Sequence, residues 1–146
     1  MTEEEENDAL YVCCLIEYVA RHTHNTVKYI AEKIGVDGIK KNLSIAQVNH
    51  CLTFEQVCDE TIEDYKIETG SFDAEGSCKY NVPSFTSIGK VYMRLLEDIK
   101  PDDIAQEIYN IFTSFISEAI SDFNASIFYE NRQYIFESYK AGYLLK

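Results

Sequence analysis

The feature that most constrains the fold of this chain is the apolar pattern between Pro101 and Phe123. Apolar residues recur there at steps of three and four, the period with which one face of an α-helix repeats. Pro101 suits a first helical position, and Asp102 and Asp103 suit the positive end of the helix dipole. A helix of about six turns needs partners to cover such a face, so the pattern predicts a packed, all-α chain. The apolar positions are Ile104, Ile108, Ile111, Phe112, Phe115, Ala119, Ile120 and Phe123.

Composition narrows the class of protein further. The chain has 146 residues, 46% of them hydrophobic, and a net charge of −12. This length and apolar fraction predict one globular domain over 1–146, and the negative charge disfavours contact with nucleic acid or anionic membrane. Glu3–Glu6 are unlike the basic start of a signal peptide, and no apolar run reaches the ~20 residues of a membrane span. We therefore expect a cytoplasmic protein.

The first half of the chain, residues 8–65, carries several helix signals. We expect residues 1–7 to form an acidic disordered tail, with Asn7 or Asp8 capping a helix to about residue 22. Thr26 is placed to cap a second helix that Gly35 ends. Short helices follow at 37–43 and from about 44, and Thr53 with Gln56 three residues later predicts a capping box for a helix to 65.

The second half, residues 84–146, follows a segment rich in turn-forming residues. Gly, Ser and Asp at 66–83 predict a loop with at most one short β segment near 79–82. Three helices are expected at about 84–99, 101–123 and 131–141, and Gly89 inside the first marks a close approach of two helices. The prediction is a compact bundle of about six helices in two packed halves.

Residues 27–43 give one alternative function. Ala31 followed four residues later by Gly35 matches the first helix and turn of a helix-turn-helix, although Lys41 and Ser44 fall where the second helix should be apolar. The alternative is therefore a DNA-binding regulator with a degenerate helix-turn-helix at 27–43. Its candidate DNA-binding residues are Lys28, Lys33, Lys40 and Lys41.

Residues that hold metals or perform catalysis form no familiar pattern here. The chain has no GxSxG sequence and no glycine-rich phosphate loop, and its five cysteines include no CxxC pair. We therefore expect no enzyme activity, no catalytic residues, no metal and no cofactor. The side chains considered as zinc ligands, whose spacing fits no standard site, are His22, His24, His50, Cys51 and Cys58.

Two groups of side chains are candidates for contact with a protein partner. Carboxylates repeat at helical spacing along 55–64, which is typical of a solvated helix face, and tyrosines gather near the C-terminus. Tyrosine combines apolar area with a hydroxyl, a combination that suits protein interfaces. The candidate partner-binding residues are Glu55, Asp59, Glu60, Glu63, Asp64, Tyr129, Tyr134 and Tyr143.

Three stretches carry a resemblance to known proteins: residues 10–21 (LYVCCLIEYVAR), residues 38–72, and VPSF with IGKVY within residues 82–92. They resemble a family of small acidic helical bacterial proteins of uncharacterised function. Genes of that family often lie beside one for a predicted ADP-ribosyltransferase-like protein, in toxin–antitoxin-like clusters. The resemblance implies a partner-binding role and supplies no catalytic residues.

The functional prediction is a non-enzymatic, acidic protein-interaction domain, an antitoxin-like or regulatory partner of a neighbouring gene product. The acidic residues predict a protein partner with a basic surface. Nucleic acid and membrane are not expected partners, and the sequence leaves a homo-oligomer open.

Overall fold

The computed structural model describes the whole chain, residues 1–146, as eight α-helices with one short 3₁₀ helix and no β-strand. The all-α prediction is confirmed, with eight helices in place of about six and no strand near 79–82. The elements are α1 (Glu3–Thr23), α2 (Val27–Ser44), α3 (Ala46–Asn49), α4 (Phe54–Tyr65), α5 (Phe85–Ile99), α6 (Ile104–Phe112), α7 (Phe115–Ser121), η1 (Ile127–Tyr129) and α8 (Arg132–Ala141).

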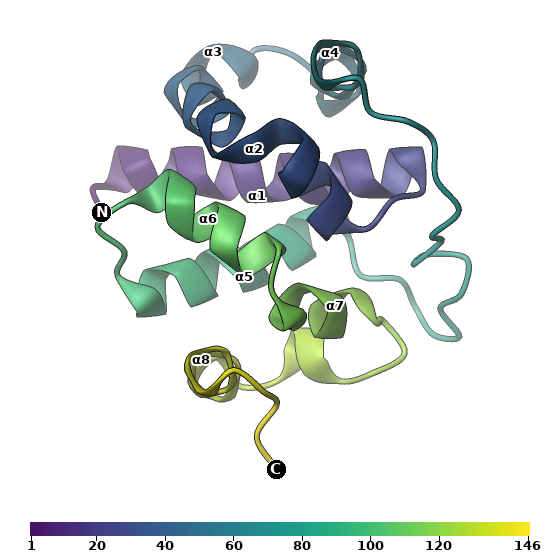
Figure 1. Ribbon diagram of the computed structural model, residues 1–146, viewed down its shortest axis with the longest axis vertical. Helices are drawn as coiled ribbons and strands as arrows, with labels where there is room; N and C mark the ends of the chain where they lie inside the picture. The colour runs from purple at the N-terminus through teal and green to yellow at the C-terminus, as the bar shows by residue number, and fades with distance from the viewer.

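Helix α1 runs through the middle of the molecule, and the other helices are arranged around it (Figure 1). It packs against α5, α2 and α4, and α2 in turn packs against α6. The helices of the first half therefore interleave with those of the second. Helices α3 and α4 lie at one end of the molecule, and α8 lies at the opposite end. No helix in the chain combines the length and apolar character that crossing a bilayer demands.

The N-terminal acidic residues differ from the prediction, because they are helical. Thr2 caps α1: its hydroxyl accepts from the Glu5 N–H at 3.1 Å, and the Glu5 carboxylate accepts from the Thr2 N–H at 2.9 Å. This capping box places four glutamates, Glu3–Glu6, in the first turn, where the helix dipole favours negative charge. The prediction of a disordered tail at 1–7 with a cap at Asn7 or Asp8 is wrong for this reason.

The single helix predicted over 101–123 is two helices. Lys100 adopts a left-handed conformation that ends α5, and Asp103 caps α6, so Pro101 precedes the helix. The break after Phe112 comes from Ser114, whose hydroxyl donates to the Ile111 carbonyl at 2.7 Å and caps α7. Such side-chain bonds compete with the helical ladder. Most of the apolar face is buried as predicted, and Ile104, Phe115 and Ala119 are half-buried.

Other local signals are confirmed. Thr26 caps α2, and Thr53 forms a capping box with Gln56 at the start of α4. Gly35 has φ 71° and ψ 169°, a conformation essentially restricted to glycine, and it divides α2 into segments 27–34 and 36–44. The close approach predicted at Gly89 is also present, because a Cβ there would lie 3.1 Å from the Cα of Cys14 in α1.

Candidate functional site

The acidic residues predicted to bind a partner lie together on α4. Its buried face, which packs toward α1, consists of Val57, Cys58 and Thr61, and the carboxylates are exposed on the remaining faces of the helix. None of them forms an ion pair, because the anions of the three ion pairs in the molecule are Glu17, Glu75 and Asp98. The exposed carboxylates are Glu55, Asp59, Glu60, Glu63 and Asp64.

Two exposed apolar residues shortly precede α4 in the chain, a feature that the sequence analysis missed. Val48 in α3 and Leu52 in the turn between α3 and α4 are exposed and retain 68% and 40% of their accessible surface. The turn is held against α1 by Tyr11, whose ring centroid lies 4.6 Å from that of His50 and 5.1 Å from that of Phe54. We call Val48, Leu52 and the five carboxylates the α4 surface.

The three candidate tyrosines do not join the α4 surface. Tyr129 in η1 and Tyr143 after α8 are exposed, but they lie at the α8 end of the molecule, opposite α4. Tyr134 is half-buried, and its hydroxyl donates to the Leu145 carbonyl at 2.6 Å. The predicted partner-binding residues therefore fall into two separate places.

The four lysines of the DNA-binding alternative are all exposed but differ in their surroundings. Lys28 and Lys33 precede the break at Gly35, whereas Lys40 and Lys41 follow it. Lys40 lines an acidic hollow between α1, α2 and α6, where carboxylates offset its charge. The acidic residues of that hollow are Glu5, Asp8, Asp102 and Asp103.

The side chains considered as metal ligands stay apart. His22 stacks beside Tyr18, and His24 adopts the left-handed cap that ends α1. Cys51 is exposed while Cys58 is buried, and all five cysteines are free thiols. Across the chain, no three His, Cys, Asp or Glu side chains are grouped as a metal site would require.

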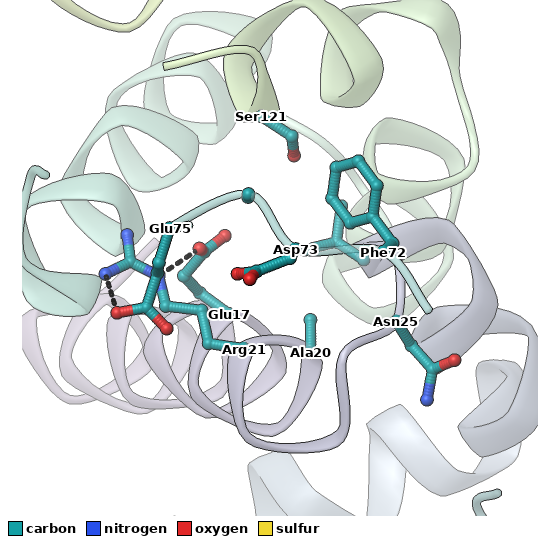
Figure 2. Close-up of a pocket in the computed structure, with 10 residues that line it drawn as sticks. Glu17, Ala20, Arg21, Asn25, Phe72, Asp73, Glu75 and Ser121 are labelled. Atoms are coloured by element: carbon teal, nitrogen blue, oxygen red, sulfur yellow. Dashed lines mark hydrogen bonds and ion pairs between the residues drawn. The ribbon is translucent and has the colours of Figure 1, made fainter. Parts of the chain in front are cut away.

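A buried ion pair inside α1 is the most unusual polar feature of the structure (Figure 2). The Arg21 Nε donates to the Glu17 Oε2 at 2.7 Å, and the Glu17 side chain is only 3% exposed. Burial raises the pKa of Glu17, and Arg21 offsets part of that rise. Arg21 also lies 5.0 Å over the Phe123 ring and 3.9 Å from Glu75. The pair was not predicted, although a Glu and an Arg four residues apart in an apolar helix could have signalled it.

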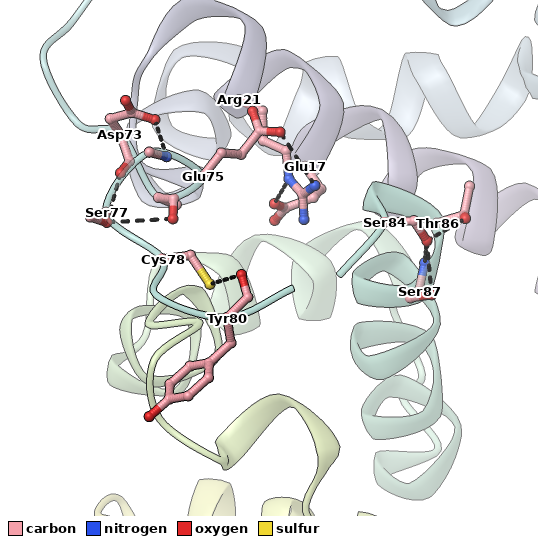
Figure 3. Close-up of polar contacts among 12 residues, drawn as sticks. Glu17, Arg21, Asp73, Glu75, Ser77, Cys78, Tyr80, Ser84, Thr86 and Ser87 are labelled. Atoms are coloured by element: carbon pink, nitrogen blue, oxygen red, sulfur yellow. Dashed lines mark hydrogen bonds and ion pairs between the residues drawn. The ribbon is translucent and has the colours of Figure 1, made fainter. Parts of the chain in front are cut away.

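The loop between α4 and α5, residues 66–84, covers this pair. The N–H of Gly70 donates to the Thr23 carbonyl and that of Phe72 to the His24 carbonyl, both at 2.9 Å, and the Asn124 side chain donates to the loop's far end. The space beneath the loop is small, because the centre of a water-sized sphere can move there within a volume of only about 10 Å³. It has room for about one water molecule and for no organic substrate. Contacts within the loop join Asp73 to Ser77 and Cys78 to Tyr80 (Figure 3).

Tyr92 of α5 is fully buried beside this pair. Its ring stacks on Phe112 with centroids 4.1 Å apart, while its hydroxyl makes no hydrogen bond. Burial raises the pKa of Tyr92 well above its ordinary value, and the nearby Glu17 carboxylate raises it further, whereas the Ser121 side chain lowers it in part. The hydroxyl is therefore a buried polar group with a weak polar contact to Ser121 and no full hydrogen bond within the protein.

The unpartnered hydroxyl makes Tyr92→Phe a stabilising substitution. The variant keeps the ring stack and removes a desolvation penalty, so the free energy of unfolding should rise by about 1 kcal/mol. Urea denaturation measures it. The matched control is Tyr139→Phe, which removes a hydroxyl that donates to Glu107 at 3.0 Å and should lower stability by about 1 kcal/mol. A loss of stability in both variants would show that the Tyr92 hydroxyl has a partner.

The α4 surface is thus the site that gathers the most predicted residues. The Glu17–Arg21 pair beneath the loop belongs to the interior of the molecule. Comparison with known proteins adds no residues to the α4 surface: no protein-family model, curated protein or solved structure matches this chain.

Proposed function

We propose that this chain is a protein-interaction domain that binds a partner with a basic surface through the α4 surface. The observation that carries the proposal is the set of five exposed carboxylates on α4 without an ion pair. The resemblance of residues 10–21 and 38–72 to small bacterial proteins extends it to a regulatory or antitoxin-like role toward a neighbouring gene product. No enzyme activity is part of this proposal.

The two components of the surface have different physical roles. Like charges on one exposed face produce a negative potential that accelerates encounter with a basic protein and is screened by salt. Val48 and Leu52 add apolar area, and a buried Val or Leu side chain is worth about 1.5–3 kcal/mol. Because the Tyr11 stack already holds the turn, binding orders few additional residues.

Neutralising the acidic face should slow association. The variant carries Asp59→Asn, Glu60→Gln, Glu63→Gln and Asp64→Asn. Proteins that the wild-type chain recovers from lysate of its native host, with and without nuclease, are identified by mass spectrometry. The recovered protein is then measured by surface plasmon resonance at low and high salt. We expect the association rate to fall by about tenfold at low salt and its salt dependence to flatten.

A second quadruple variant controls for net charge. It carries Glu3→Gln, Glu4→Gln, Glu118→Gln and Glu137→Gln, four exposed carboxylates outside α4, and should change association much less. Equal slowing in both variants, or none in the α4 variant, would contradict the proposal. A recovered protein that disappears on nuclease treatment would instead favour the DNA-binding alternative.

A further inference from the structure

A pocket separate from the α4 surface lies where η1 and α8 pack against α5, in the part of the molecule below α5 in Figure 1. Its volume is about 240 Å³, slightly below the range of typical drug-sized ligand sites. Three of its apolar residues are buried core side chains, and Phe128 is half-buried. These apolar lining residues are Val91, Leu95, Phe128 and Ile135.

Arginine is concentrated at this pocket. The chain contains only three arginines, of which Arg21 is used inside the core, and both of the others line the pocket. Arg132 is held by Asp98 through contacts of 3.1 and 2.9 Å, and it donates to the carbonyl of Arg94 at 3.2 Å. The exposed Arg94 guanidinium itself makes no hydrogen bond or ion pair within the protein. Its planar set of donors is suited to a carboxylate.

We propose that this pocket binds a small amphipathic carboxylate, with the carboxylate on Arg94 and the apolar part against Val91, Leu95 and Ile135. The pocket supplies both kinds of contact that such a molecule needs: one cation without a direct ion-pair partner and an apolar wall. The carboxylate of Glu130 also lines the pocket and accepts from the Ser126 hydroxyl at 2.9 Å. It opposes an anionic ligand, so its removal should tighten binding.

In the test, the protein is titrated with octanoate as the probe and with octanol and acetate as comparisons. Binding is measured from the chemical shifts of the backbone amides in solution. Octanoate should bind saturably and shift amides within residues 91–95 and 128–135, whereas octanol and acetate should each bind more weakly. Arg94→Gln should raise the Kd of octanoate about tenfold and leave that of octanol unchanged. Glu130→Gln should lower the Kd of octanoate.

Lys90→Gln is the matched control, because it removes one positive charge from an exposed position of the same helix outside the pocket. It should leave octanoate binding unchanged. The proposal is overturned if octanol binds as tightly as octanoate, if Lys90→Gln weakens binding as much as Arg94→Gln does, or if the shifts map elsewhere. The α4 quadruple variant should bind octanoate normally, so this result does not depend on the proposed protein partner.

Discussion

Replacing Arg21 by leucine is expected to lower the free energy of unfolding by about 3–5 kcal/mol at neutral pH. The leucine keeps an apolar side chain near Phe123 but leaves the Glu17 carboxylate buried without its cation and without its 2.7 Å hydrogen bond. A buried charge that loses its partner retains the full desolvation penalty. Urea denaturation followed by circular dichroism measures the change.

The loss of stability in Arg21→Leu should depend on pH. Arg21 lowers the pKa of Glu17 by its charge and by its hydrogen bond, while burial raises it above the ordinary value of 4.5. Without Arg21 the effects that remain, burial and the charge of Glu75, both raise the pKa, so the folded-state pKa rises further. A raised folded-state pKa gives stability that is present below the unfolded pKa and lost as pH rises through the folded pKa. The difference between variant and wild type should therefore be small near pH 4.5 and grow toward neutrality.

A double variant separates the broken charge pair from lost packing. Glu17→Met with Arg21→Leu removes both charges and keeps apolar volume, so its stability should lie within about 1–2 kcal/mol of wild type. If the double variant is as unstable as Arg21→Leu, the loss of stability comes from packing and not from the unpaired charge. The same conclusion follows if the loss of stability in Arg21→Leu does not change with pH.

Sequence reasoning was most successful where a single residue type determines the local structure. The caps at Thr26 and Thr53 and the break at Gly35 are local features, because the groups that interact lie within a few residues. The division of 101–123 was missed because apolar periodicity continues across it. Side-chain hydrogen bonds to the backbone at the break, from Thr113, Ser114 and Ser117, distinguish two helices from one.

Contacts between distant segments could not be predicted in the same way. The carboxylates of α4 were identified because they follow one another along a single helix, but the exposure of Val48 and Leu52 depends on the turn held by Tyr11. Arg94 and Arg132 are 38 residues apart in the chain, and only the packing of α8 on α5 brings them to one pocket. A sequence alone does not show which helices become neighbours.

Gly89→Val is expected to cost about 3 kcal/mol of stability, because α5 lies close against the backbone of α1 at Gly89. A Cβ at this position would lie 3.1 Å from the Cα and N of Cys14 and would clash with the Cys14 Sγ. Those backbone atoms belong to the central, buried part of α1 and cannot move aside as a flexible side chain would. Overpacking of this kind typically costs 1–3 kcal/mol, and valine adds two methyl groups to the contact.

Two comparisons show whether helix contact causes that loss. Lys90→Val introduces the same side chain at the neighbouring exposed position of α5, where it should cost less than about 1 kcal/mol. Gly89→Ala should be destabilising despite the ~1 kcal/mol advantage of alanine in a helix, and adding Cys14→Ala should restore part of the stability because it removes the Sγ. If Gly89→Ala alone stabilised the protein, the Cα and N of Cys14 would have to lie farther than 3.1 Å from a Cβ at position 89. The interleaving of the two halves through α1 and α5 would then be looser than the structure shows.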